Sequence, residues 1–357
     1  MVGALALSLA ACGSDPGAET PGGEGSEGAT GLSGELNGGG ASSQESAMEA
    51  WRAGFQSANP DVTVNYDPTG SGGGRENFIS GAFAFAGSDS ALDEDEMAAA
   101  EAQCGEGGVI EYPGYISPVA VAFNLEGIDT LNMSGETIAK IFNGDITAWD
   151  DEAIAADNPD ADLPSEDITP VHRSDESGTT GNFTNYLSTV AGDAWTFGEI
   201  EQWPNEAGGE GGKGTSGVVQ VVTDAPNTIG YADASQAGGL GQANIGVGEE
   251  FVAPSAEAAA KIFEVSPRVD EGSAVNMAYD LDYTTEEAGV YPIVLTSYMV
   301  ACETYDDEAT AANVKGYLSY VLSDEGQEIG QSEAGSAPLT DTVISEAQAI
   351  VETISAG

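Results

Sequence analysis

Three short apolar segments early in the chain, each followed by a loop rich in Gly, Ser or Asp, constrain the fold more than any other feature. The segments have the length of β-strands and span residues 36–40, 62–66 and 83–86. Helical patterns separate them, which predicts an α/β fold with mainly parallel sheets. In doubly wound sheets the loops at the carboxyl ends of the strands line the ligand crevice. We therefore expect these three loops to meet at one site.

The first helix is expected to follow residues 42–45, which have capping-box spacing, and to end near Pro60. The side chains expected on its buried face are Ala47, Met48, Trp51 and Phe55. Further along, strands are expected near 119–123, 168–171, 228–231 and 293–301. Two helices are expected to close the chain.

A different signal lies at residues 172–180, where an arginine adjoins hydroxyls and a glycine. Arg173 offers a planar fork of donors, and Ser177 and Thr179 offer hydroxyls. Gly178 lets backbone N–H groups approach a small ligand closely. A helix that begins after Ser177 would add unpaired amides and a positive end. The segment predicts an anion site, in which Ser177 caps the helix, donates to the anion, or does both.

The charge of the chain argues against two classes of partner. The 357 residues include 60 Asp+Glu and 8 Lys+Arg, which gives a formal net charge of −52 at pH 7. Such a field repels nucleic acids and anionic membrane surfaces, so neither is an expected direct partner. We interpret the acidity as a solvated surface, as in exported or salt-adapted proteins. The length and a hydrophobic content of 41% suffice for about two domains.

The amino terminus resembles a bacterial lipoprotein signal. Residues 1–12 form a short apolar run that ends in small residues before Cys12, the residue that would be acylated. Residues 13–34 are almost entirely Gly, Ser, Pro, Glu, Thr and Ala, the composition of a flexible tether. The run contains no Lys or Arg and is short for a complete signal, which leaves open whether Met1 is the natural start. We expect an extracytoplasmic protein anchored to the cell membrane only by a lipid on Cys12.

Export also bears on the two other cysteines. Cys104 and Cys302 would face an oxidising or unprotected compartment. The sequence leaves two possibilities open, a disulfide between them or two free thiols.

Taken together, the loops resemble those of the phosphate-binding protein of the bacterial phosphate-specific ABC importer, a periplasmic-binding-protein fold (type II) with two lobes around a ligand cleft. The resemblance covers nearly the whole chain from Leu36 onward. It rests on residues 38–43, 70–73, 87–89 and 173–179, with further matches at 142–149, 229–231 and 291–293. It implies a first lobe at 35–118 and 297–357, a second lobe at 119–296, and hinges near 117–120 and 293–297.

The resemblance also implies a set of phosphate-binding residues. The expected ligands are Ser42, Ser43 and Ser71 from the first lobe, and Arg173, Ser177, Gly178 and Thr179 from the second. Asp175 would orient the guanidinium of Arg173. Other members have Thr-Phe where this chain has Ser42 and Ser43. A backbone N–H donation survives that exchange, whereas aromatic packing over the ligand does not.

Asp89 completes the set and is the residue expected to select phosphate. A carboxylate in an anion site lowers affinity unless the ligand brings a proton. Hydrogen phosphate and dihydrogen phosphate carry one, whereas sulfate at neutral pH does not. We expect Asp89 to accept a hydrogen bond from phosphate and to exclude sulfate. The alternative is that Asp89 caps a helix that begins before Leu92.

His172, the only histidine, raises the alternative of a hydrolase with a Ser, His and Asp set. Neighbours in sequence rarely meet in that geometry, and no Gly-x-Ser-x-Gly motif surrounds Ser177. The cysteines and the histidine lack metal-site spacing, and the acidic run 93–96 is typical of a solvated helix start. We expect no catalysis, no cofactor and no metal site.

The sequence thus predicts a monomeric, extracytoplasmic solute-binding protein that captures inorganic phosphate and delivers it to the permease subunits of an ABC transporter. Two alternatives stay open: a receptor for another tetrahedral oxyanion, and an adhesin, sensor or phosphate-cleaving relative that reuses the fold. Asp89 separates the first alternative, because a fully deprotonated oxyanion has no proton to donate to it.

Overall fold

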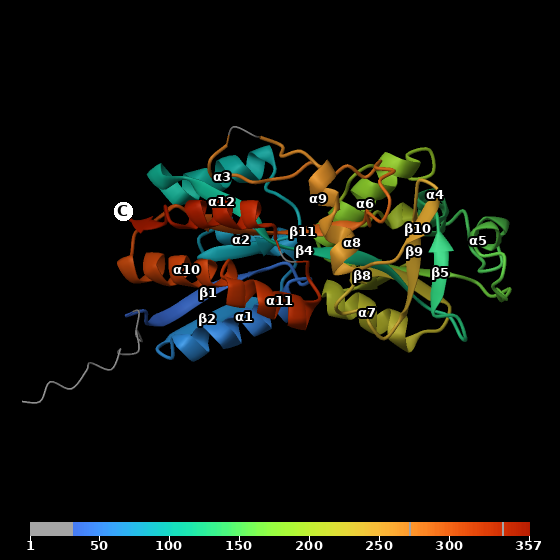
Figure 1. The fold of residues 1–357 in the computed structure, drawn as a ribbon, viewed down its shortest axis with the longest axis horizontal. Coiled ribbons are helices and arrows are strands. Elements are labelled where there is room, and N and C mark those ends of the chain that lie inside the picture. The colour runs from blue at the N-terminus through green and yellow to red at the C-terminus, as the bar shows by residue number, and fades with distance from the viewer. Residues whose placement is uncertain (1–30, 271–272, 338) are drawn as a thin grey trace, which may run out of the picture.

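The computed structural model describes residues 31–270, 273–337 and 339–357. The predicted signal segment with Cys12 lies outside the described residues, as does the predicted tether up to residue 30. Figure 1 shows two groups of helices and strands, the first lobe on the left and the second lobe on the right, joined by two long strands. The carboxyl terminus lies at the end of the first lobe that faces away from the second.

The first lobe begins with the three predicted strand, loop and helix units. Its strands are β1 (Gly34–Gly40), β2 (Val62–Asp67) and β3 (Phe85–Ser88), which are parallel in the order β2-β1-β3. Its helices are α1 (Glu45–Ala58), α2 (Ser71–Ile79) and α3 (Glu94–Cys104), with a 3-10 turn η1 (Gly105–Gly107) after α3. The third strand begins two residues later than predicted.

The predicted apolar face of α1 is confirmed, but its predicted cap is wrong. The buried side chains of the helix are Ala47, Met48, Trp51 and Phe55. The N-cap is Gln44, and no side chain caps the helix. Ser42 and Ser43 fail to cap because their hydroxyls contact Thr215 and Asp89, far away in sequence.

Two long antiparallel strands connect the lobes, β4 (Val109–Asn124) and β11 (Val294–Cys302). Residues 109–118 of β4 pair with β11, and from Val119 onward β4 pairs with β8 (Thr228–Asp233) and β9 (Gly241–Val247). The partner of β4 therefore changes inside the predicted hinge at 117–120. The sheet is mixed, in the order β2-β1-β3-β11-β4-β8-β6-β7, because β11 is antiparallel to both β3 and β4.

The second lobe carries the remaining strands of this sheet. They are β5 (Thr130–Met133), β6 (Thr169–Arg173), β7 (Glu210–Gly212) and β10 (Glu250–Val252), in addition to β8 and β9. Its helices are α4 (Gly135–Phe142), α5 (Glu152–Asp157), α6 (Gly178–Ala191), α7 (Gly214–Asp224), α8 (Ala256–Ala260) and α9 (Ile262–Val265), with a 3-10 turn η2 (Asn205–Ala207). As in the first lobe, β6 pairs in parallel with both β7 and β8.

After β11 the chain returns to the first lobe and closes with three helices, where the sequence predicted two. They are α10 (Glu308–Val321), α11 (Asp324–Ala334) and α12 (Asp341–Val351), between the paired short strands β12 (Thr304–Tyr305) and β13 (Ser355–Ala356). The break between α10 and α11 contains no Gly or Pro. The two helices are separated by Ser323, which is the N-cap of α11 and whose hydroxyl accepts a hydrogen bond from the N–H of Gly326.

One part of the predicted second lobe packs against the first. The N–H of Glu111, near the start of β4, donates to the carbonyl oxygen of Val275 (2.9 Å), and the N–H of Met277 donates to that of Glu111 (2.8 Å). Arg268 also forms an ion pair with Glu346 in α12. The segment after α9 therefore packs on the first lobe, although the predicted bounds assign it to the second lobe.

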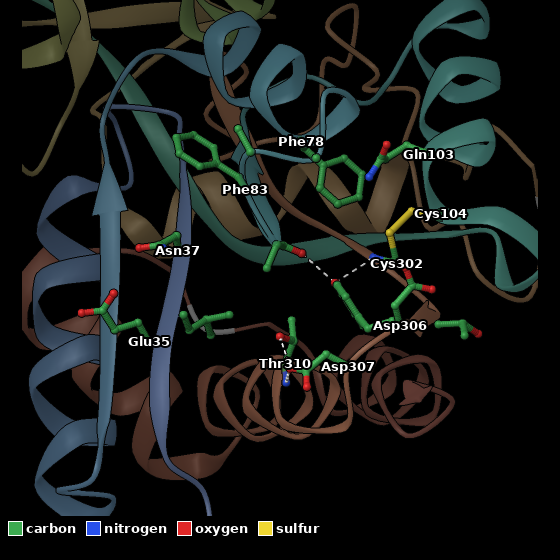
Figure 2. A pocket seen from close by; sticks show the side chains of 16 residues that line it. Glu35, Asn37, Phe78, Phe83, Gln103, Cys104, Cys302, Asp306, Asp307 and Thr310 are labelled. Atoms are coloured by element: carbon green, nitrogen blue, oxygen red, sulfur yellow. Dashed lines mark hydrogen bonds between the residues drawn. A yellow bond between two sulfur atoms is a disulfide. The ribbon is translucent and has the colours of Figure 1, made fainter. Parts of the chain in front are cut away.

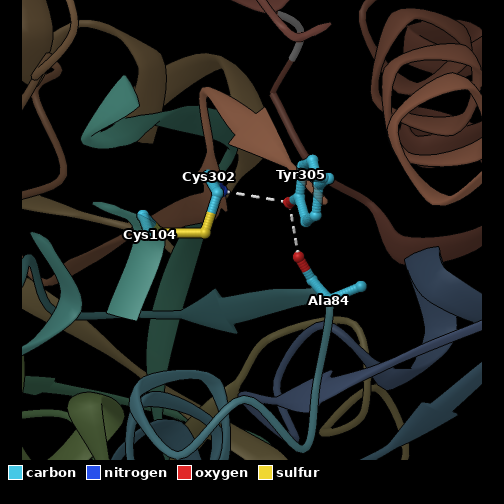
Figure 3. The surroundings of a disulfide bond; sticks show 4 residues. All are labelled: Ala84, Cys104, Cys302 and Tyr305. Atoms are coloured by element: carbon cyan, nitrogen blue, oxygen red, sulfur yellow. Dashed lines mark hydrogen bonds between the residues drawn. A yellow bond between two sulfur atoms is a disulfide. The ribbon is translucent and has the colours of Figure 1, made fainter. Parts of the chain in front are cut away.

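Cys104 and Cys302 are joined by a disulfide in the structure (Figure 3). They are the last residues of α3 and β11, which are 198 positions apart in sequence. The hydroxyl of Tyr305 accepts a hydrogen bond from the N–H of Cys302 (3.0 Å) and donates to the carbonyl oxygen of Ala84 (2.6 Å). The disulfide thus belongs to a connection between β3, α3 and the end of β11.

The same cysteines line a pocket of about 350 Å³ (Figure 2). It lies at the amino ends of β1 and β3, where Asn37 and Phe83 form part of its wall. The predicted anion loops follow the carboxyl ends of those strands. This pocket is therefore separate from the site described next.

Candidate functional site

The loops that follow β1, β3 and β6 meet at the junction of the two lobes, around the carboxylate of Asp89. Ser43 Oγ donates to Asp89 Oδ2 over 2.5 Å, and Thr179 Oγ1 donates to the same oxygen over 3.1 Å. Ser297 Oγ donates to Asp89 Oδ1 over 2.9 Å. All four residues are buried. Hydroxyls from α6 of the second lobe and from the first lobe therefore share one carboxylate.

Burial raises the pKa of Asp89, although the hydrogen bonds from Ser43, Ser297 and Thr179 and the charge of Arg173 oppose that rise. The alternative that Asp89 caps a helix is wrong. The following helix α3 begins at Glu94 and has Asp93 as its N-cap, in a capping box with Glu96. Asp89 therefore has a position that helix capping does not explain.

Ser71 and Gly178 bring the two lobes into contact beside Asp89. Ser71 begins α2, and its Oγ accepts a hydrogen bond from the N–H of Asp89 (3.1 Å). Gly178 begins α6 on the opposite side. A Cβ added at Gly178 would lie 2.8 Å from Ser71 Oγ and 2.8 Å from the backbone nitrogen of Ser90. Only glycine allows the lobes to approach this closely without a displacement.

Arg173 ends β6 with its side chain held by Asp175. Its Nε and Nη2 donate to the two carboxylate oxygens of Asp175 over 2.9 and 2.5 Å, and its Nη1 lies 3.5 Å from Thr179 Oγ1. Burial alone would raise the pKa of Asp175, but the hydrogen bond and charge of Arg173, together with backbone N–H donors such as Gly214, lower that pKa below its usual range. Asp175 also accepts from the N–H of Gly214 (3.0 Å). The contact between Asp175 and Arg173 is the one that the family resemblance implied.

Ser42 and Ser177 use their hydroxyls within the protein. Ser177 is the N-cap of α6 and accepts from the N–H of Thr180 (3.3 Å), so its predicted capping role is confirmed. Ser42 Oγ lies 3.2 Å from Thr215 Oγ1 and accepts from the N–H of Thr215 (3.0 Å). Thr215 belongs to α7 of the second lobe, so Ser42 forms a further contact between the lobes.

Sequence reasoning missed several residues of this site. The sequence predicts Ser297 only as part of a hinge, and it assigns no site role to Thr215. Asn182 Nδ2 donates to the carbonyl oxygen of Asp89 (2.6 Å), and Gln44 Nε2 donates to Ser297 Oγ (2.7 Å). The consecutive hydroxyl residues Thr296, Ser297 and Tyr298 in the otherwise apolar strand β11 are a usable signal for Ser297. For Thr215 the signal was a Gly-Thr pair at a helix start, as at Gly178 and Thr179.

His172 lies outside this arrangement. Its Nδ1 is 2.8 Å from the carbonyl oxygen of Arg173, and its ring stacks on Trp203 with the ring centres 4.9 Å apart. Burial lowers the pKa of His172. Ser177 Oγ accepts from the Thr180 N–H and His172 Nδ1 faces the Arg173 carbonyl oxygen, so neither hydrogen bond links the serine and the histidine considered for a hydrolase.

The described residues also lack two features. Among residues 31–270, 273–337 and 339–357, no group of three His, Cys, Asp or Glu side chains is placed to hold a metal ion. Within the same residues, no helix combines the length and apolar character needed to cross a membrane.

The chain thus has two α/β lobes joined by the paired strands β4 and β11, and hydroxyl, amide and guanidinium donors lie at their junction. This arrangement is that of a two-lobed binding protein for a small polar ligand. A family model described as "PBP superfamily domain" matches residues 25–325. "Phosphate-binding protein PstS 3" of Mycobacterium tuberculosis strain H37Rv is 35% identical over 362 residues, covering 99% of this chain and 97% of that protein. "Phosphate-binding protein PstS 2" of the same strain is 32% identical over 363 residues, with the same coverage of both chains. The chain therefore belongs to the PstS family of phosphate-binding proteins, within the PBP superfamily.

Solved structures support the fold independently of these sequences. A high affinity periplasmic phosphate-binding protein (PfluDING), solved with bound phosphate at pH 8.5, aligns with a TM-score of 0.71 at 20% identity. The alignment covers 88% of this chain and 93% of that one. The predicted two-lobed α/β fold is thereby confirmed.

Proposed function

We propose that this chain is an extracytoplasmic solute-binding protein that captures inorganic phosphate and delivers it to an ABC permease. The observation that carries the proposal is the position of Asp89, a buried carboxylate surrounded by hydroxyl donors from both lobes and near Arg173. Donors attract an oxyanion, and the carboxylate requires that the oxyanion bring a proton. Phosphate at neutral pH meets both requirements. Membership of the PstS family supports the same ligand.

The predicted ligand residues take separate roles in this proposal. Arg173, held in place by Asp175, supplies the charge, and the amino ends of α2 and α6 supply N–H groups beside Ser71 and Gly178. Thr179 and the hydroxyl pair of Ser42 and Thr215 stand where the lobes meet. The full set proposed is Ser42, Ser43, Ser71, Asp89, Arg173, Ser177, Gly178 and Thr179.

Ser43 has a particular place in this set. Its hydroxyl already donates to Asp89 over 2.5 Å, so it orients the carboxylate where other members carry an aromatic ring. We propose that its share in ligand binding comes from the backbone N–H and from this orienting hydrogen bond.

The remaining parts of the proposal concern the molecule in the cell. We propose a monomer without enzymatic activity or cofactor, with lobes at 35–118 plus 297–357 and at 119–296, of which the segment around Val275 packs on the first lobe. It is held to the membrane by a lipid on Cys12. Cell fractionation tests the anchor, because Cys12→Ala should move the protein from the membrane fraction to the soluble fraction.

Isothermal titration of the purified protein with phosphate, sulfate and arsenate tests the ligand. We expect phosphate to bind at least about 30-fold more tightly than sulfate, which corresponds to the lower value of about 2 kcal/mol for an unpaired charge in a binding site. Arsenate is protonated like phosphate and should be excluded poorly. Equal affinities for phosphate and sulfate would contradict the proposal, and binding of sulfate alone would favour a receptor for another oxyanion.

A further inference from the structure

Arg75 in α2 is a buried arginine whose three bonding partners come from different parts of the chain. Its side chain is 4% exposed. Nε donates to Glu96 Oε1 over 2.8 Å, Nη1 to Ser88 Oγ over 3.0 Å, and Nη2 to Glu201 Oε2 over 2.6 Å. The guanidinium therefore has a partner on each of its three nitrogens. The sequence analysis gives no role to Arg75 or Glu201.

These partners divide between the two lobes. Ser88 ends β3 and Glu96 lies in α3, both in the first lobe with Arg75. Glu201 lies in the second lobe, between α6 and η2. The bond from Arg75 to Glu201 therefore spans the junction, whereas the other two bonds stay within one lobe.

The bond that spans the junction lies close to the anion site on both sides. In the first lobe, Ser88 directly precedes Asp89, and Arg75 shares helix α2 with Ser71. In the second lobe, the carbonyl oxygen of Glu201 accepts from the N–H of Ser177 (3.1 Å). The Arg75–Glu201 ion pair therefore links the two segments that carry the proposed ligand residues.

The two lobes pack tightly beside the Arg75–Glu201 ion pair. This ion pair can therefore form only when the lobes are closed. A Cβ added at Gly72, one turn before Arg75 in α2, would lie 2.5 Å from Cδ of Glu176 in the second lobe. Any separation of the lobes at this point lengthens the distance between Arg75 and Glu201. Ser88 and Glu96 still hold Arg75 after such a separation, so the guanidinium stays paired and correctly oriented for the lobes to close again.

We propose that the Arg75–Glu201 ion pair is a latch that keeps the lobes closed and sets how long a bound anion stays. The proposal rests on the proposed function, since it concerns the release of the captured phosphate. The latch forms only after the lobes close. It therefore slows dissociation, and the association step, which takes place with the lobes apart, does not depend on it. Arg75 and Glu201 act as positioning residues that need not touch the ligand.

The test compares Glu201→Gln with Glu96→Gln, a matched control. Both carboxylates bind Arg75, and their side chains are similarly exposed, at 19% and 22%. Only Glu201 reaches across the junction, and glutamine at position 96 can still serve in the capping box of α3. Each variant is loaded with radiolabelled inorganic phosphate and chased with unlabelled phosphate to measure release. Association is measured separately.

We expect Glu201→Gln to speed release about tenfold and to change the association rate less than twofold. Glu96→Gln should change both rates less than twofold. Glu201→Ala should release phosphate at least as fast as Glu201→Gln. The alanine variant is included because a glutamine at position 201 can still accept a hydrogen bond from Arg75. Thermal unfolding without phosphate should give similar midpoints for the position 96 and position 201 glutamine variants, because a general loss of stability is not the mechanism.

Two results would overturn the latch. One is that both position 201 variants release phosphate at the wild-type rate. The other is that Glu96→Gln and Glu201→Gln increase the release rate equally. Failure of the proposed function looks different, because the wild-type protein would then bind no labelled phosphate at all.

Discussion

At the scale of single residues, the proposed preference for phosphate over sulfate rests on the charge of Asp89. Asp89→Asn keeps the shape of the side chain and removes the charge that a deprotonated anion would face. We expect sulfate affinity to rise and phosphate affinity to fall about 10- to 100-fold, the range for one hydrogen bond to a charged group. Titration calorimetry with both anions measures the ratio. An unchanged ratio in the variant would remove Asp89 from the selection of the ligand.

Glu111 is a second buried carboxyl, and it makes stability depend on pH. Burial raises its pKa to about 7, against the opposing effects of the Leu92 N–H and the Arg75 charge. The folded protein therefore holds a proton that the unfolded chain releases near its ordinary pKa of about 4.5. The stability that this proton contributes is complete below about pH 4.5 and is lost as the pH rises through about 7.

Glu111→Gln removes this titration and leaves the other acidic groups in place. The free energy of unfolding of the wild type, minus that of the variant, should fall by about 3 kcal/mol between pH 4.5 and pH 8, the equivalent of the raised pKa. Urea unfolding of both proteins across that range measures the difference. Parallel pH profiles would show that Glu111 has an ordinary pKa in the folded protein.

At the scale of elements, the disulfide between Cys104 and Cys302 restrains two segments that the sequence places far apart. It closes a loop with a sequence separation of 198 between the ends of α3 and β11. We expect the double variant Cys104→Ser, Cys302→Ser to lose about 2–5 kcal/mol of stability, chiefly because its unfolded chain is less restricted. Chemical unfolding measures the loss, and the wild type in reducing agent should match the variant. Equal stability of oxidised wild type and variant would contradict this role.

At the scale of the whole molecule, the net charge of −52 opposes the approach of phosphate. Arg173 offsets this field little, because it is buried and paired with Asp175. Raising sodium chloride from 0.1 to 1 M shortens the screening length from about 10 to about 3 Å. We expect the association rate to rise by up to about tenfold in stopped-flow measurements. Potassium chloride should give the same result, and a clear fall in rate would show that attraction around Arg173 governs the approach.

Much of this architecture follows from local sequence. The apolar face of α1 has the helical period and is buried as predicted. The loops after β1 and β3 lie together because parallel strands end at one edge of a sheet, and the loop after β6 meets them from the second lobe. The errors have two causes, a distant partner and a cap without a glycine or proline. Ser42 and Ser43 look like a helix cap in isolation, but their hydroxyls bind Thr215 and Asp89, which a local window does not contain. The Ser323 cap that separates α10 from α11 has no glycine or proline to mark it.

The sequence by itself determined the α/β class, the family and the segments that form the site, because strand periods, glycine loops and cap residues act over a few positions. Only the tertiary structure decided which of those groups face one another. It placed Ser297 against Asp89, packed the segment around Val275 on the first lobe, and joined Arg75 to Glu201 across the junction. Those contacts depend on how two lobes fold back along β4 and β11, and the partners are more than a hundred residues apart in sequence.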